Sequence, residues 1–188
     1  MKKNSIVTIA IAFAVLMLNA CKKEETTVAP PDPENEVITT VKLVAINVAD
    51  TTEIVTGQWK DITPNDGNPD VSQARLVLKK NAIYKVSATF LDETKSPAAD
   101  ITTEITERAN YHLVCYAPAA GLALTVVRTD YDNNTPKLEL GLKTTFTTGG
   151  ITNGNLQVSL HHQPTGKNGT DCSIGSSDAE VNFSINIM

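Results

Sequence analysis

Hydrophobic and polar residues alternate along most of the chain after Val37. Every second residue is apolar from Tyr84 to Phe90, and the closing stretch from Val181 to Ile187 repeats this pattern with Asn and Ser in between. Strict alternation places the apolar side chains on one face of a β-strand and the polar side chains on the other. Antiparallel sheets tolerate one solvated face, whereas parallel βαβ units bury both. The pattern therefore predicts antiparallel strands with one buried face.

Four further stretches alternate in the same way, and Gly, Asn, Asp and Pro cluster between them: 74–78, 122–126, 138–142 and 156–160. About eight to ten short strands with frequent turns predict an all-β, antiparallel two-sheet β-sandwich, either Ig-like or transthyretin-like. One such domain accounts for residues 37–188. A short helix over 101–109 is the exception, because Asp100 could cap it, although its Thr content favours a strand.

The amino-terminal region follows a different pattern. Two lysines precede an apolar run from Ile6 to Leu18, which is typical of a signal peptide and too short to span a bilayer. The closing Leu18-Asn19-Ala20-Cys21 resembles the lipobox of bacterial lipoproteins, whose cysteine is acylated after the preceding peptide is removed. The resemblance implies a signal peptide over residues 1–20, a lipidated Cys21 and a stable membrane anchor, because several acyl chains hold a protein to a bilayer.

Residues 21–36 predict a flexible tether between the lipid and the domain. They are polar and contain three prolines, a composition that does not form a core. The charged cluster that follows Cys21 is similar to signals that carry lipoproteins to the outer face of the outer membrane. A solvated linker explains the same cluster. We therefore expect an outer-membrane location, and the sequence is compatible with both the periplasmic face and the cell-surface face.

The charge of the chain excludes one class of partner. The full sequence has 16 basic and 21 acidic side chains, a net charge of −5. Cleavage before Cys21 removes two lysines and no acid, which makes the mature chain more acidic still. A protein with this balance lacks the positive surface that nucleic acids require, so no nucleic-acid partner is predicted.

Several motifs across the mature domain support a wider resemblance: Gln58-Trp59-Lys60-Asp61, Tyr84 to Glu93, His112 to Tyr116, Gly141 to Gly149, His162-Gln163-Pro164 and Gly169 to Cys172. Together with the lipobox, they resemble a group of small Bacteroidota-type lipoproteins, some of which are labelled as resembling type 1 periplasmic-binding proteins. The resemblance implies a membrane-anchored companion of TonB-dependent importers, with no settled activity. The periplasmic-binding fold itself needs alternating βαβ units, which this chain does not show.

The histidines and the remaining cysteines are candidate metal ligands: His112, Cys115, His161, His162 and Cys172. Imidazole and thiolate suit zinc or copper, and a distal histidine can bind haem iron. On a regular strand His112 and Cys115 face opposite sides, as do His161 and His162. The alternative is one histidine at the core edge, His162, and two exposed ones.

Cys115 and Cys172 are the two thiols left once Cys21 carries lipid. Because the compartment is oxidising, a disulfide between them is the leading prediction, and free thiols or metal ligation are the alternatives. No pattern of neighbouring His, Asn or Asp marks either cysteine as an activated nucleophile. We therefore expect no enzymatic activity.

Asp130, Asp132 and Asn134 form D-x-D-x-N, the first half of an EF-hand calcium loop. The glycine and the terminal glutamate of such a loop are missing, since Pro136 and Lys137 follow. Residues 61–70 contain a similar group of Asp and Asn. A structural calcium ion and simple turn formation both remain open at these loops.

Together, these features predict a non-enzymatic, lipid-anchored accessory binding module that serves uptake of a metal or haem at the outer membrane. A structural or adhesive surface module that binds protein partners through an edge strand is the first alternative. The second is a glycan-binding lipoprotein, for which Trp59 beside an acidic loop is the candidate platform. A lone Trp in a sandwich also fits the core.

Overall fold

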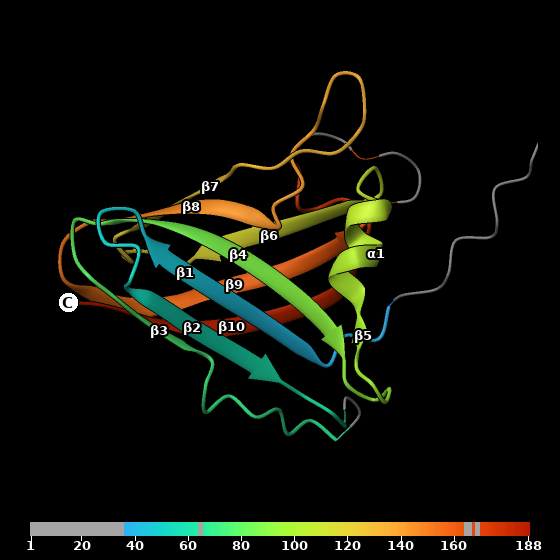
Figure 1. Ribbon diagram of the computed structural model, residues 1–188, viewed down its shortest axis with the longest axis horizontal. Helices are drawn as coiled ribbons and strands as arrows, with labels where there is room; N and C mark the ends of the chain where they lie inside the picture. The colour runs from blue at the N-terminus through green and yellow to red at the C-terminus, as the bar shows by residue number, and fades with distance from the viewer. Residues whose placement is uncertain (1–35, 64–65, 164–166, 168–169) are drawn as a thin grey trace, which may run out of the picture. The chain divides into compact units, whose positions relative to one another are not determined.

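Two β-sheets lie face to face in a computed structural model of the chain (Figure 1). The structure describes residues 36–63, 66–163, 167 and 170–188. The predicted signal peptide, the predicted lipidation site Cys21 and the predicted tether up to residue 35 lie outside these residues. Residues 33–188 form one compact unit that contains every described strand and the described hydrophobic core.

The six-stranded sheet has the order β2-β1-β4-β8-β7, and β5 pairs with β4 beside this path. Its strands are β1 (Thr40–Asn47), β2 (Ile54–Lys60), β4 (Ile83–Asp92), β5 (Ala99–Asp100), β7 (Leu124–Arg128) and β8 (Lys143–Thr148). Each neighbouring pair is antiparallel.

The four-stranded sheet has the order β3-β10-β9-β6. Its strands are β3 (Arg75–Leu78), β6 (His112–Pro118), β9 (Thr152–His162) and β10 (Ser176–Ile187). Only β3 pairs in parallel, with β10. The predicted all-β sandwich is therefore confirmed, with this one parallel pair as a local exception.

Burial follows the alternation read from the sequence. In β10, Val181, Phe183, Ile185 and Ile187 are buried, while the Asn and Ser residues between them are exposed. The inward rows of both sheets meet in one hydrophobic core, which includes Phe183 and the fully buried Tyr84. Burying each such large side chain contributes about 1.5–3 kcal/mol, which explains why the period-two rows fix the strand faces.

Helix α1 (Ile101–Glu107) forms at the segment where the sequence left helix and strand open. The Asp100 side chain accepts a hydrogen bond from Thr102 N at 3.0 Å and so caps the first turn. Ile101 and Ile105, four residues apart, are buried on one face of the helix. No helix among the described residues is long and apolar enough to cross a membrane.

Residues 138–142 alternate like a strand but form only an isolated bridge between Tyr131 and Glu139. Two carboxylates accept hydrogen bonds from backbone N–H groups that a neighbouring strand would otherwise bind. Asp132 accepts from Leu138 N, and Asp130 accepts from Gly141 N, each at 2.8 Å. Local carboxylate bonds of this kind compete with sheet ladders.

Candidate metal centre

Three side chains from distant parts of the sequence converge at the end of the four-stranded sheet where β6 begins. Glu36 precedes β1, His112 is the first residue of β6, and Asp178 belongs to β10. One ligand atom of each residue lies within 4.8 Å of the other two. Within the described parts of the chain, this is the group of His, Cys, Asp and Glu side chains that could hold a metal ion.

The backbone orients His112 toward this group. Its side chain is fully buried, and Nδ1 lies 3.1 Å from the carbonyl oxygen of Arg108. Nδ1 therefore carries a proton and donates a hydrogen bond to that oxygen, which directs Nε2 at the carboxylates. Histidines that bind metals are held in the same way, by a bond from the other ring nitrogen to a carbonyl or carboxylate.

The contact between His112 and Glu36 needs a cation. Nε2 of His112 lies 3.3 Å from Oε1 of Glu36, without the geometry of a hydrogen bond. Because Nδ1 already carries one proton, a neutral ring would turn its Nε2 lone pair toward a carboxylate. Either a second proton or a metal ion at Nε2 removes this repulsion.

A β-bulge brings Asp178 into the site. The register of β10 against β9 shifts between Ser177 and Ala179, so Asp178 is the extra residue of β10. Both of its carboxylate oxygens are buried and have no hydrogen-bond partner among the described residues. Bulges often redirect a side chain beside a functional site, and this one places a carboxylate next to Glu36 and His112.

The two carboxylates differ in their affinity for protons. Burial raises the pKa of Asp178 from 3.8 to about 7, and the negative charge of Glu36 adds to the effect. Burial also raises the pKa of Glu36, but the contact with His112 outweighs it and leaves that pKa below its ordinary value. Arg108 lies 3.8 Å from Oε1 of Glu36 and supports the charged form of this carboxylate.

His162 supplies a second imidazole at the site. It is the cross-strand partner of His112, and the two rings stack with centroids 5.0 Å apart and planes 17° apart. Burial lowers the pKa of His162, which keeps the ring neutral, the form in which imidazole binds metals. The alternative with His112 exposed is wrong, because pairing with β9 turns His112 into the core.

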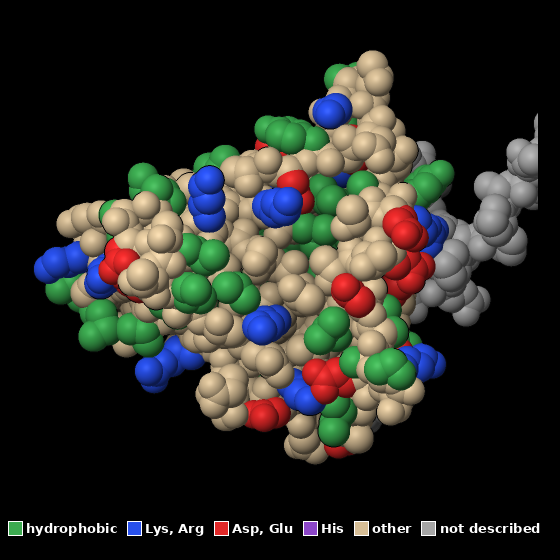
Figure 2. Space-filling model, viewed as in Figure 1, with side chains coloured by type: hydrophobic (Ala, Val, Ile, Leu, Met, Phe, Trp, Pro, Cys, Tyr) green, Lys and Arg blue, Asp and Glu red, His purple; other side chains and the backbone are tan. Residues whose placement is uncertain are grey.

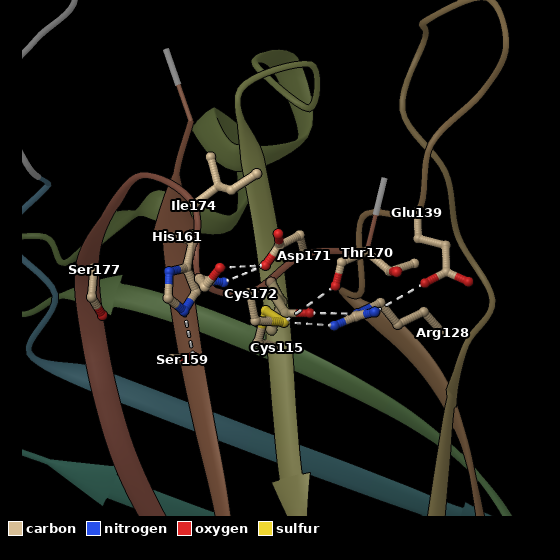
Figure 3. Close-up of a disulfide and its surroundings, with 12 residues drawn as sticks. Cys115, Arg128, Glu139, Ser159, His161, Thr170, Asp171, Cys172, Ile174 and Ser177 are labelled. Carbon is tan, nitrogen blue, oxygen red and sulfur yellow. Dashed lines mark hydrogen bonds and ion pairs between the residues drawn. A yellow bond between two sulfur atoms is a disulfide. The ribbon is translucent and has the colours of Figure 1, made fainter. Parts of the chain in front are cut away.

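His161 lies apart from the site, as the alternation predicted. Its ring nitrogen Nε2 is 2.9 Å from the hydroxyl of Ser159, on the face of the sheet that carries the disulfide (Figure 3). His161 and His162 therefore face opposite sides of β9, and only His162 lies beside the candidate centre.

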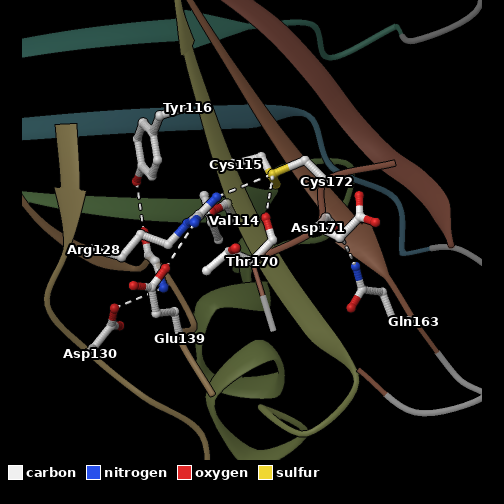
Figure 4. A network of polar contacts seen from close by, with 11 residues as sticks. Val114, Cys115, Tyr116, Arg128, Asp130, Glu139, Gln163, Thr170, Asp171 and Cys172 are labelled. Atoms are coloured by element: carbon white, nitrogen blue, oxygen red, sulfur yellow. Dashed lines mark hydrogen bonds and ion pairs between the residues drawn. A yellow bond between two sulfur atoms is a disulfide. The ribbon is translucent and has the colours of Figure 1, made fainter. Parts of the chain in front are cut away.

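Cys115 and Cys172 form a disulfide, with Cα atoms 6.1 Å apart. Neither sulfur is therefore a metal-binding thiolate. The Arg128 guanidinium lies against this bond: its Nη2 is 3.2 Å from Cys172 Sγ, and its other nitrogens donate to the Val114 carbonyl and to Glu139 (Figure 4). The disulfide holds the segment before β10, and thus the approach to Asp178, on β6.

The D-x-D-x-N loop does not gather its side chains around one point. Asp132 accepts backbone N–H groups from Asn134 and Leu138, and its carboxylate lies 3.2 Å from the buried ammonium of Lys167. Asp130 accepts from Gly141 N instead. The lysine provides the positive charge that a calcium ion would bring, and the hydrogen bonds of these residues stabilise a turn, which favours the alternative of simple turn formation at this loop.

The other two candidates from the sequence also have structural roles. In the 61–70 loop, Asp66 accepts from Asn68 N, and Asp70 accepts from Ser72 N. Trp59 is half-buried and packs against the hydrophobic core, so it does not offer an exposed platform for a sugar ring.

Two of the three converging residues, Glu36 and Asp178, were not among the candidates from the sequence. Glu36 ends the polar segment that reads as tether, and nothing in that composition marks it. Asp178 left a weak signal: it lies where the alternation of the last strand first becomes irregular, between Ser177 and Ala179. An acidic residue at such a break in the alternation indicates a β-bulge.

We expect Asp178→Asn to stabilise the metal-free protein at pH 8. The folded state binds the Asp178 proton more tightly than the unfolded state does, so stability falls as pH rises from about 4 to 7. Each pKa unit is worth about 1.4 kcal/mol at full burial, and solvent screening of this half-buried group reduces the total to about 2 kcal/mol. Urea unfolding in EDTA between pH 5 and pH 8 measures this effect. A wild-type curve as flat as that of the variant would contradict it.

A scan against models of protein families finds no match for this chain, and searches of curated proteins and of solved structures find none either.

Proposed function

We propose that this protein is a lipid-anchored, non-enzymatic binding module of the outer membrane that holds a divalent transition-metal ion. Glu36, His112 and Asp178 are the ligands, and His162 stacks on the ring of His112 beside them. The observation that carries the proposal is their convergence: three buried or half-buried ligand groups from distant segments, with ligand atoms within 4.8 Å of one another.

The energetics of the cluster favour a bound cation. Glu36 and Asp178 place two carboxylates side by side, and the side chain of Glu36 is only 5% exposed. Buried carboxylate oxygens without hydrogen bonds carry a desolvation penalty of about 1–3 kcal/mol or more each. Arg108 offsets part of this cost for Glu36, whereas neither carboxylate oxygen of Asp178 has a hydrogen-bond partner among the described residues. A divalent ion would neutralise both carboxylates.

The donor set indicates the class of metal. Imidazole nitrogen with carboxylate oxygen suits Zn²⁺, Mn²⁺ or Fe²⁺, whereas calcium prefers oxygen alone. Haem fits less well, because the His112 ring is fully buried and its Nε2 faces two carboxylates. Ligand atoms around a tetrahedral zinc lie about 3.4 Å apart, so the widest separation in this group would have to shorten by up to about 1.4 Å to close on an ion.

The location and the role in uptake are supported by the sequence. The lipobox at Cys21 and the resemblance to Bacteroidota-type lipoproteins favour an anchored companion of a TonB-dependent importer. A rigid sandwich with a ligand site at one end suits capture or delivery of a scarce metal, because it needs no turnover and no hinge.

The test is to measure zinc binding by calorimetry and to compare His112→Ala with His161→Ala. We expect His112→Ala to weaken zinc binding at least about 100-fold, since it removes the nitrogen that faces both carboxylates. His161→Ala removes an imidazole of the same chain from the opposite face and should change the affinity less than about threefold. Elemental analysis of the native protein identifies the metal it carries.

Two outcomes would overturn the proposal. One is the absence of zinc, manganese or iron binding by the metal-free protein at neutral pH. The other is an equal loss of affinity in both histidine variants, which would place the ion on the surface.

A further inference from the structure

The outer face of the six-stranded sheet has lysines but no carboxylates over most of its area. Away from the end that carries β5, the outward positions of this sheet are 54, 56 and 58 in β2, 42, 44 and 46 in β1, 83, 85, 87 and 89 in β4, 143, 145 and 147 in β8, and 125 and 127 in β7. Lys42, Lys85 and Lys143 are the charged residues in this set. The next row toward β5 contains Lys60, which pairs with Glu93, and Asp100. The full chain has a net charge of −5, so this face departs from the protein as a whole.

The three lysines belong to one continuous surface. Lys143 lies opposite Ser87 and Lys85 opposite Thr145, which places these two lysines diagonally across β4 and β8, about 7–8 Å apart at the backbone. Lys42 lies opposite Thr89 on the other side of β4. Hydroxyl groups fill most of the positions between them. Figure 2 shows this face, with the basic side chains spread over it and many of the acidic ones toward the end that carries α1.

Exposed aliphatic side chains border the lysines at the opposite end of the same sheet. Ile46 and Ile54 are cross-strand partners, and Ile46 also lies opposite Lys85. Val48 follows, with its N–H bonded to the carbonyl of Ile83. These four aliphatic side chains are between 37% and 57% exposed. A patch of contiguous exposed aliphatic residues beside lysines marks an interaction surface more often than an ordinary solvated one.

We propose that this face lies against an anionic, phosphate-bearing lipid surface. The inference deepens the proposed function, since it rests on the lipid anchor and states how the anchored module is oriented. Lysines attract the phosphates at about 1 kcal/mol each, and the isoleucines enter the interface beside them. The lysines and aliphatic side chains then meet the membrane, and the acidic side chains of this face lie toward its α1 end and in the turn that contains Asp50.

Charge complementarity selects this occupant. A nucleic acid would be repelled by the acidic surfaces beside this face and would leave the aliphatic patch uncovered. A second copy of the same chain carries the same net negative charge and would be repelled as well. A membrane surface offers phosphate and hydrocarbon at neighbouring depths, which matches lysines that lie next to isoleucines. The candidate metal centre includes His112 of β6 and Asp178 of β10, which belong to the four-stranded sheet, so docking of the six-stranded sheet does not involve these two ligands.

The test uses residues 33–188, which contain every described strand and core residue and lack the acylated cysteine. Flotation measures binding to vesicles of phosphatidylcholine mixed with phosphatidylglycerol, and to vesicles of phosphatidylcholine alone. We expect binding to the mixed vesicles that falls with added salt, and little binding to the neutral ones. The double variant Lys85→Glu with Lys143→Glu should lower the partition coefficient at least about 30-fold.

The matched control reverses two basic residues elsewhere, Arg75→Glu with Lys137→Glu, and should bind within about threefold of the parent chain. Equal losses in both double variants would reduce the effect to net charge and overturn the proposal, as would equal binding to both kinds of vesicle. Circular dichroism of each variant shows that the fold is retained. Because neither acylation nor metal enters this assay, its failure is distinguishable from failure of the anchor or of the metal centre, which palmitate labelling and calorimetry test separately.

Discussion

Removal of the Cys115–Cys172 disulfide is expected to lower the free energy of unfolding by about 4 kcal/mol. The bond closes a loop of 57 residues, and restricting the unfolded chain over that length gives this value by chain entropy. Cys115 is also buried although it faces away from the core, where Cys172 lies against it through the disulfide. Loss of the bond therefore removes a covalent restraint and loosens this contact.

The measurement is urea unfolding of the wild type and of Cys115→Ala with Cys172→Ala, each with and without reductant. The reductant should destabilise the wild type by about 4 kcal/mol and leave the double variant unchanged. Cys21→Ser provides a control that removes a cysteine and keeps the pair. We also expect zinc affinity to fall in the double variant, since the bond holds the segment that precedes Asp178. A destabilisation below about 1 kcal/mol would contradict the prediction.

Most of the fold could be predicted from the sequence because the apolar period is a direct consequence of strand geometry. The apolar residues from Val181 to Ile187 lie on one side and the polar residues between them on the other only if the segment is a β-strand. The order of the strands could not be predicted in this way. It depends on which strands pair across long loops, and the parallel pairing of β3 with β10 leaves no trace in either segment.

The candidate site could be predicted only in part, for a related reason. Alternation placed His162 on the core face, and pairing with β9 explains why His112 joins it there. Pairing is a tertiary property, so the stacked rings could not be inferred from two residues 50 positions apart. Asp178 required a bulge that inverts its expected direction, and Glu36 required the end of the polar segment to fold back onto β6.

The D-x-D-x-N loop shows the converse case, because a positive side chain of the same protein neutralises its buried carboxylate. Asp132 faces Lys167, which is 35 residues away and fully buried with it. Local sequence showed the carboxylates correctly but could not show that a lysine neutralises them. In the metal centre the balance differs, since Arg108 lies 3.8 Å from Glu36, while both carboxylate oxygens of Asp178 lack a hydrogen-bond partner among the described residues. The presence or absence of a buried counter-charge distinguishes the D-x-D-x-N loop from the metal centre better than any spacing of acidic residues does.

Gly175 links the disulfide to the metal centre, and Gly175→Ala is expected to cost about 3 kcal/mol or more. Its φ of +83° is in the left-handed region, which costs alanine about 1–2 kcal/mol. In addition, a Cβ at this position would lie 2.0 Å from the carbonyl oxygen of His162. The start of β10 would have to move away from β9, and Asp178 and His162 would separate.

Gly121→Ala is the matched control for this substitution, because Gly121 has a φ of +85° and a Cβ at that position would meet no atom within 4 Å. It reports the backbone cost alone, about 1 kcal/mol, and should leave zinc binding unchanged. Urea unfolding and zinc calorimetry on both variants then separate strain from crowding. If Gly175→Ala matched Gly121→Ala in both measurements, the close approach of β10 to His162 would not be what positions Asp178, and the bulge alone would have to hold the carboxylate in the site.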